Sequence, residues 1–327
     1  MGTLFIDHGH TELRWRDDAL ELRRDGRLLR TVPARLLERV VLRAETVVTS
    51  STLAHMADAG IGIVALGGRS GQKIAHLLGG PVSDARARIA QCQRVDDEAF
   101  AGPWCARLVR AKLRAQQRVL NHALAQRPDQ RLPLSKALRS LADCLDALQG
   151  CQDRCRVRGI EGAAAAAYFR GYASLFAPAL AFTKRQRRPA PDPVNACLSL
   201  GYTLLHAHAV QACWAAGLDP MVGFLHLPAH GRASMACDLM EPWRPRVDAW
   251  VWEQFRQAAL RPEHFGRDGA AACVIGKAGR AYFYKAVTPL LADCARGLRR
   301  HARLAALGLT DAVRLPEVDD VSEDSEP

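Results

Sequence analysis

The first eighty residues carry short runs in which apolar and polar positions alternate, the two-residue period of half-buried β-strands. In ALELRRDGRLLRTVP two such runs flank Asp25-Gly26, a dipeptide that favours a tight hairpin. The segment SSTLAHMADAG has a helical pattern that ends at Gly60. Further strands are expected in TLFID, TELRW, ERVVL, TVVT and GIGIVAL. The pattern predicts a small β-rich lobe over residues 1–80.

The hydrophobic period changes towards 3.6 residues after LLGGPVS, residues 77–83, whose glycines and proline mark the expected domain boundary. A basic cluster from Lys184 to Arg188 falls in an expected exposed loop. Helices are predicted at 84–94, 98–126, 133–150, 152–176, 193–216 and 277–307. We therefore predict an α+β fold, in which a larger all-α lobe of residues 81–314 follows the β-rich lobe.

The chain is strongly basic, with 45 Lys and Arg against 34 Asp and Glu, a formal net charge of +11. Residues 315–327 hold six acids and no base, so residues 1–314 carry 45 positive and 28 negative groups, or +17. The acidic tail is too polar to bury apolar surface, and we predict that it is disordered. The positive surplus favours a polyanionic partner such as nucleic acid, although a solvated arginine-rich surface would give the same composition.

The ten cysteines show no C-x-x-C pair and no regular spacing, unlike a zinc ribbon or a disulfide framework. Most fall in apolar helical patterns and are expected to be free thiols in a reducing compartment. The start of the chain lacks the pattern of a signal peptide, and no stretch approaches 18 uninterrupted apolar residues. We expect a soluble cytoplasmic protein with no membrane partner.

Glu161 stands in VRGIEGAAAAAYFRGY, where Gly159, Gly162 and five alanines leave no polar neighbour and would let another helix approach closely. The carboxylate is therefore expected to be buried. Burial is costly unless the group is paired, protonated or bound to a metal. Arg158, one turn earlier, could supply an intrahelical ion pair, so that interpretation and a metal site both stay open.

Two further carboxylates, Asp238 and Glu241, lie three residues apart in DLMEP. They could form a capping box, with Asp238 as the N-cap and Glu241 as the third helical residue. Pro242 weakens that interpretation, because the residue before a proline avoids the α region, which places Glu241 at a turn or a strained helical start. A carboxylate at a turn is freer to face a cavity.

Two histidines precede these acids in GFLHLPAHGR. His226 ends a packed apolar run, whereas His230 lies between a proline and a glycine in an expected exposed loop. Rigid elements hold ligands better than loop tips, which favours His226, although either could be an ordinary core histidine. Carboxylates with one imidazole form a mainly hard donor set that suits Mg²⁺ or Mn²⁺. Such ions serve phosphoryl chemistry, here on the phosphodiesters that the basic chain would attract.

The chain resembles the CRISPR-associated protein one family, the integrase of spacer acquisition. The resemblance covers almost the whole sequence, because several motifs occur in the family's order: TLFID, RGIEGAAAAAYF, PAPDPVNACLSLGYTLL, GLDPMVGFLH and DLMEPWRP. It implies a sandwich-like β-rich lobe followed by an α-helical catalytic lobe. It also implies a homodimer that assembles with CRISPR-associated protein two and acts on double-stranded DNA, the prespacer and the CRISPR repeat.

The resemblance further implies a metal-dependent DNA endonuclease and integrase, in which a 3′-hydroxyl attacks a phosphodiester. On the matching motifs, Glu161, His226 and Glu241 are the expected metal ligands, and Asp238 supports them at the same site. Arg232, Arg244, Lys277 and Lys285 are expected phosphate contacts, with solvated surface charge as the alternative. Asn195, Tyr168 and Tyr202 are weaker candidates, expected to position or pack.

Two departures from the family pattern affect these expectations. The second acid that usually follows the motif acid is here Pro242, and a tyrosine near the end of the GYTLLY helix is replaced by His206, followed by His208. No role of that tyrosine is transferred. The main alternative function is a catalytically silent, basic nucleic-acid-binding protein whose acids are only caps and ion pairs. A hydrolase for a small phosphorylated substrate would not need so basic a chain.

Overall fold

Short alternating strands build the N-terminal part of the protein, seen in a computed structural model that describes residues 2–67, 73–77, 85–187, 189–268 and 272–310. They form two four-stranded sheets, ordered β1-β5-β7-β8 and β4-β3-β2-β6. The strands are β1 (Gly2–Ile6), β2 (Thr11–Arg16), β3 (Ala19–Arg24), β4 (Arg27–Pro33), β5 (Leu37–Leu42), β6 (Thr46–Val48), β7 (Gly62–Gly67) and β8 (Lys73–Leu77). Helix α1 (Ser50–Asp58) packs against β2.

The hairpin predicted at Asp25-Gly26 is present between β3 and β4. Both residues have positive φ, 49° and 75°, as a two-residue hairpin turn requires. Alternation along the strands sends Leu13, Leu20 and Val40 into one fully buried cluster. Strand β8, which pairs antiparallel with β7, was not predicted.

The C-terminal part is mainly helical, so the predicted fold class is confirmed. Its helices are α2 (Arg86–Arg94), α3 (Glu98–Gln126), α4 (Arg131–Ala147), α5 (Arg154–Ala173), α6 (Pro193–Ala215), α7 (Ser234–Met240), α8 (Arg244–Arg256) and α9 (Lys277–Thr310). Short 3₁₀ turns are η1 (Ala34–Leu36), η2 (Pro128–Gln130), η3 (Pro178–Leu180), η4 (Glu241–Trp243) and η5 (Pro262–His264).

Helices α7 and α8 were not predicted from the sequence patterns. The antiparallel hairpin of β9 (Phe265–Asp268) and β10 (Ala272–Ile275) was not predicted either, so this lobe is not all-α. Four-residue strands are too short to show an alternating pattern. Of the predicted boundary at 77–83, only Leu77, the end of β8, lies within the described residues, and the acidic tail lies outside them altogether.

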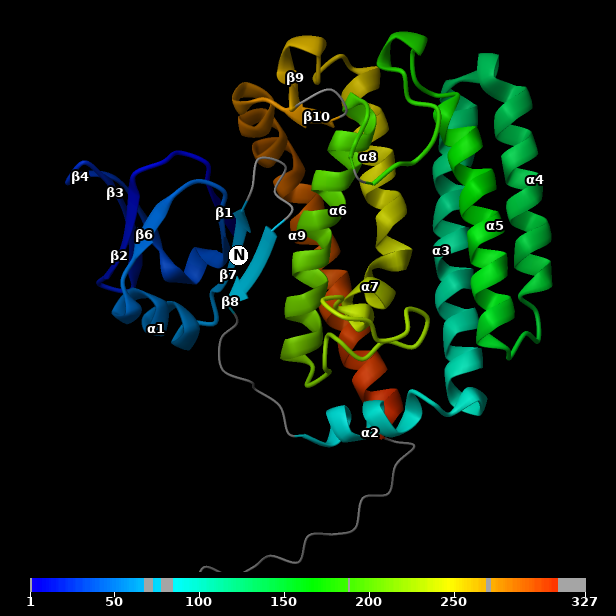
Figure 1. The fold of residues 1–327 in the computed structure, drawn as a ribbon, viewed down its shortest axis with the longest axis horizontal. Coiled ribbons are helices and arrows are strands. Elements are labelled where there is room, and N and C mark those ends of the chain that lie inside the picture. Colours follow the sequence, from blue (N-terminus) through cyan, green and yellow to red (C-terminus); the bar gives the residue numbers. More distant parts are fainter. Residues whose placement is uncertain (1, 68–72, 78–84, 188, 269–271, 311–327) are drawn as a thin grey trace, which may run out of the picture.

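The two lobes touch through β1 and α9. Phe5 stacks on Tyr284 with ring centroids 4.4 Å apart, and the Asp7 carboxylate pairs with Arg280 at 3.0 Å. Farther from these contacts, α3, α4 and α5 lie side by side, and α3 also packs against α8 and η4 (Figure 1). This packing places one face of α3 between α5 and the turn that begins at Glu241.

Close helix approach occurs on α5, but at a different glycine from those expected. A Cβ on Gly159 or Gly162 would meet no atom within 4 Å, so these residues face open space. A Cβ on Gly171 would lie 2.6 Å from the Cβ of Ala137, which shows that α4 approaches α5 there. The glycines beside Glu161 thus leave room next to its carboxylate.

Candidate metal centre

Three separate elements carry the predicted ligands. Glu161 lies on α5, His226 lies within the segment between α6 and α7, and Glu241 opens η4. Glu161 and His226 line an open depression of about 410 Å³ together with Arg158, Gly159 and other residues. Glu241 is buried, and its Oε1 is 4.0 Å from Nε2 of His226.

Asp238 fixes the position of His226. Its Oδ2 accepts hydrogen bonds from the backbone N–H groups of Phe224 and Leu225, at 2.7 and 2.9 Å, and its Oδ1 accepts one from that of His226 at 2.9 Å. The same Oδ1 is 2.7 Å from Nδ1 of the His226 ring. An ionised carboxylate only accepts, so Nδ1 donates, and in a neutral imidazole this leaves the lone pair on Nε2, the nitrogen on the side of Glu241.

The burial of Asp238 has an electrostatic cost. Its side chain is fully buried, and burial raises the pKa of the carboxyl, while the hydrogen bond from His226 opposes that rise. The carboxylate is compensated by four donors rather than by a full positive charge. This arrangement, a buried acid that orients an imidazole, is the one that supports histidine ligands in metal sites.

Lys112 of α3 stands between the two glutamates. Its ammonium pairs with Oε1 of Glu161 and lies 2.6 Å from Oε2 of Glu241. The partner of Glu161 is therefore Lys112, 49 positions away, and not the neighbouring Arg158 considered from the sequence. Glu161 is half-buried, with 27% of its side chain exposed, whereas the side chains of Lys112 and Glu241 are nearly enclosed.

Lys112 was not predicted as a site residue, although its place in the helical pattern indicates that it is buried. Helix α3 buries Val109, Leu113 and Gln116, and Lys112 falls on the same helical face. A lysine at a core position needs an anionic partner from elsewhere in the chain.

Glu241 has a second cationic partner, Arg244, whose Nε is 2.9 Å from Oε1. Burial acts to raise the pKa of Glu241, but Arg244 and Lys112 outweigh burial and lower that pKa to about 2. The carboxylate is therefore ionised at neutral pH. Lys112 contacts Oε2 and Arg244 contacts Oε1, so each oxygen of the buried carboxylate faces a cation.

The capping-box interpretation of Asp238 and Glu241 is wrong. Helix α7 begins at Ser234 with Ala233 as its N-cap, so Asp238 lies near the end of the helix and not at its start. Glu241 starts the 3₁₀ turn η4, as a helical start was expected, but its φ of −53° and ψ of −46° are in the α region despite Pro242. The proline occupies an early position of η4, where it removes no helical hydrogen bond.

The donor set fits a hard divalent cation in chemistry: two carboxylates and an imidazole nitrogen held by a buried acid. The positions of these side chains, however, do not form a group of three ligands. Among the residues that the structure describes, no three His, Cys, Asp or Glu side chains are grouped closely enough to hold an ion. The ammonium of Lys112 lies where Glu161 and Glu241 meet.

A buried cluster behind the centre locks three helices. Asp248 of α8 accepts hydrogen bonds from Tyr168 of α5, at 3.0 Å, and from Tyr202 of α6. Burial raises the pKa of Asp248 to about 6, against the lowering effect of the two hydroxyls. Arg244 lies over the Tyr202 ring at 4.8 Å, so the cluster continues to Glu241. Both tyrosines thus serve positioning and packing, as expected.

Two of the four expected phosphate contacts line one cavity. Arg232 and Arg244 border a hollow of about 650 Å³ together with Arg185, Arg187, His206 and other residues. Arg244 is engaged with Glu241 and Tyr202, while Lys277 and Lys285 are exposed on α9. Asn195 is buried and binds the backbone of Lys184 and Gln186, which anchors the basic loop.

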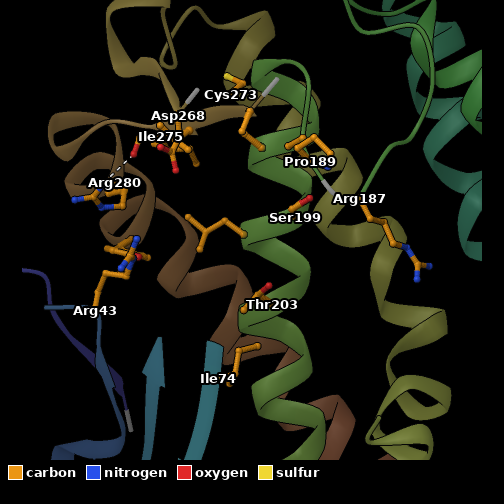
Figure 2. Close-up of a pocket in the computed structure, with 16 residues that line it drawn as sticks. Arg43, Ile74, Arg187, Pro189, Ser199, Thr203, Asp268, Cys273, Ile275 and Arg280 are labelled. Carbon is orange, nitrogen blue, oxygen red and sulfur yellow. Dashed lines mark hydrogen bonds between the residues drawn. The ribbon is translucent and has the colours of Figure 1, made fainter. Parts of the chain in front are cut away.

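A further cavity of about 340 Å³ lies between β8, α6 and the β9-β10 hairpin (Figure 2). Arg43, Arg187 and Arg280 line it, and none of the predicted metal ligands does. Arg280 is held by Asp7 and by the carbonyl of Ile275, so its role is to join the lobes.

A family model described as CRISPR associated protein Cas1 matches residues 4–288. The chain belongs to the Cas1 family. Over 293 residues it is 33% identical to CRISPR-associated endonuclease Cas1 1 of Thermodesulfovibrio yellowstonii. The alignment covers 87% of this chain and 89% of that relative. The family resemblance seen in the sequence motifs is thereby confirmed.

Solved structures share the fold of this Cas1-family chain. A casposase bound to integration product aligns with a TM-score of 0.83 at 18% identity, over 99% of this chain and 96% of that one. A Cas6-RT-Cas1–Cas2 complex aligns with a TM-score of 0.78 at 20% identity, over 94% of this chain and 35% of that one. At such identities the likeness shows the fold alone. In the described part of the chain, no helix is long and apolar enough to span a membrane.

Proposed function

We propose that this protein is a metal-dependent DNA endonuclease and integrase that inserts spacer DNA into a CRISPR array. The observation that carries the proposal is that Glu161 and His226 line one open depression, while Glu241 lies 4.0 Å from His226 and shares the ammonium of Lys112 with Glu161. Membership of the Cas1 family supports the reaction class, because the relative from Thermodesulfovibrio is named an endonuclease.

The proposed reaction is a transesterification. A 3′-hydroxyl of the incoming DNA loses its proton as its oxygen forms a bond to phosphorus, one existing P–O bond breaks, and the leaving oxygen takes up a proton. When bound, Mg²⁺ or Mn²⁺ would stabilise negative charge on the phosphate and orient the attacking oxygen. Glu161, His226 and Glu241 would hold the ion.

The remaining residues of the site act on those ligands. Asp238 keeps the His226 ring in the tautomer that presents Nε2. Arg244 anchors Glu241 from the side away from Lys112 and ties it to the Tyr202–Asp248 cluster. Fixed orientation lowers the reorganisation that charge development would otherwise require.

The proposed partner is double-stranded DNA, as prespacer and as CRISPR repeat. The basic cavity of Arg185, Arg187, Arg232 and Arg244 and the net charge of +17 over residues 1–314 support it. We further propose a homodimer in the cytoplasm that assembles with CRISPR-associated protein two. The fold shared with a Cas1–Cas2 complex supports that assembly.

A strand-transfer assay with Mg²⁺ or Mn²⁺ tests the proposal, with wild type in EDTA and the variants Glu161→Ala and Glu241→Ala run alongside. We expect integration to be lost in all three cases, while DNA binding persists. Integration that survives both substitutions would sink the assignment.

The alternative function, a silent DNA-binding protein, has one observation in its favour: Lys112 and Arg244 already neutralise the two glutamates. It predicts DNA binding with no metal-dependent strand transfer by the wild type, so the same assay separates the two functions.

A further inference from the structure

Lys112 is the residue of the candidate centre that the proposed function does not use. Its ammonium contacts Glu161 and Glu241 at the same time, although these acids come from α5 and η4. It is also nearly enclosed, with 9% of its side chain exposed. A buried ammonium is strongly destabilising unless carboxylates compensate it.

The charges around Lys112 balance without any bound ion. Lys112 and Arg244 carry two positive charges, Glu161 and Glu241 carry two negative charges, and the charge of Asp238 is met by hydrogen bonds. A divalent cation bound by the same carboxylates would add two positive charges beside a buried ammonium. Repulsion at such short range in a low dielectric is large, so ion and ammonium compete for the two glutamates.

We propose that Lys112 is a resident counter-cation, which holds Glu161 and Glu241 together in the metal-free protein and gives way when a divalent ion binds. The inference rests on the proposed function, because it concerns the same two glutamates. The ammonium stands between the two acids, where it contacts one carboxylate oxygen of each.

The test is a calorimetric titration of the full-length protein with Mn²⁺ alone, comparing wild type with Lys112→Met. Lys136→Met is the matched control, since Lys136 is an exposed lysine on α4 away from the centre and the substitution changes the net charge equally. Removing the competing cation should tighten Mn²⁺ binding by about tenfold or more, whereas Lys136→Met should bind like the wild type. Lys112→Arg, which keeps the charge, should bind no tighter than the wild type.

Thermal unfolding gives a second readout that does not depend on activity. In EDTA, Lys112→Met should melt below the wild type, because Glu161 and Glu241 lose their shared cation. Mn²⁺ should raise its melting temperature by more than it raises that of the wild type. If the variant is unfolded in EDTA, recovery of the fold on adding Mn²⁺ supports the inference, and failure to fold at saturating Mn²⁺ overturns it.

The outcomes separate this inference from the proposed function. Wild type that binds Mn²⁺ while Lys112→Met binds equally or more weakly overturns the role of Lys112 and leaves the integrase intact. Absence of Mn²⁺ binding by both proteins overturns the metal dependence, and the displacement of Lys112 with it.

Discussion

The carboxylate of Asp238 lies 2.7 Å from Nδ1 of His226 and also accepts hydrogen bonds from three successive backbone N–H groups, residues 224 to 226. One buried acid thus fixes both the ring and the loop that carries it. The relationship makes Asp238 a positioning residue whose effect on the reaction passes through His226.

Asp238→Asn should lower strand transfer by about 10- to 100-fold, because the amide cannot accept all four hydrogen bonds and loses the charge that orders the imidazole. DNA affinity should stay near that of the wild type. The control is Asp219→Asn in the segment between α6 and α7 that carries His226, where the carboxylate accepts one hydrogen bond from the backbone N–H of Met221. Equal activities of the two variants would contradict the positioning role.

Gly297 of α9 lies against Trp243 of the turn that begins at Glu241, so a substitution there tests whether α9 restrains this turn. A Cβ at this position would lie 1.8 Å from Cη2 of Trp243, two residues after Glu241. Gly297→Ala should therefore lower the free energy of unfolding by about 1–3 kcal/mol and reduce strand transfer, since the rigid indole must move.

Gly308 offers the matched control on the same helix, because a Cβ there meets no atom within 4 Å. Gly308→Ala should raise the free energy of unfolding by about 0.5–1 kcal/mol through helix propensity. Urea unfolding checks both variants, and a Gly297→Ala protein as stable as Gly308→Ala would show that α9 does not restrain Trp243.

The stability of the protein should depend on pH through Asp248. Burial raises the pKa of its carboxyl from the ordinary value of 3.8 to about 6, so the native state holds the proton more tightly than the unfolded chain. The stabilisation is present in full below the unfolded pKa and is lost as the pH rises through about 6, a change of about 2–3 kcal/mol.

Asp248→Asn removes this titration, so its free energy of unfolding should change less than that of the wild type between about pH 4.5 and pH 7. Urea unfolding at both pH values measures the difference. The same pH dependence in variant and wild type would show that another group titrates in this range.

Some of the site was predictable from local sequence and some was not. His226, Asp238 and Glu241 lie within sixteen residues, so their motif can be recognised in the sequence. The hairpin at Asp25-Gly26 was also predictable, because this dipeptide favours the turn by itself. Lys112 meets Glu161 across 49 positions, and nothing local in either segment encodes that contact. Helix α8 was not predicted, although Pro242 and Pro245 stand at early positions of η4 and α8, where proline is favoured.

Lys277 and Lys285 remain predicted phosphate contacts, and both are exposed on α9. Replacing either by alanine should weaken DNA binding and reduce the slope of log affinity against log salt by about 1, because one fewer phosphate is neutralised. Lys136→Ala on α4 is the control for a solvated lysine. A slope unchanged from that of the control would assign the two lysines to the solvated surface.

The most direct test of the account compares strand transfer by His226→Ala and His230→Ala, with Mn²⁺ or Mg²⁺ and with DNA binding measured on the same preparations. The two histidines are four residues apart, but only His226 is held by Asp238 and faces Glu241, whereas His230 is exposed in the loop. The account predicts that His226→Ala abolishes integration and retains DNA binding, while His230→Ala integrates like the wild type. Integration by His226→Ala at the level of His230→Ala would contradict it.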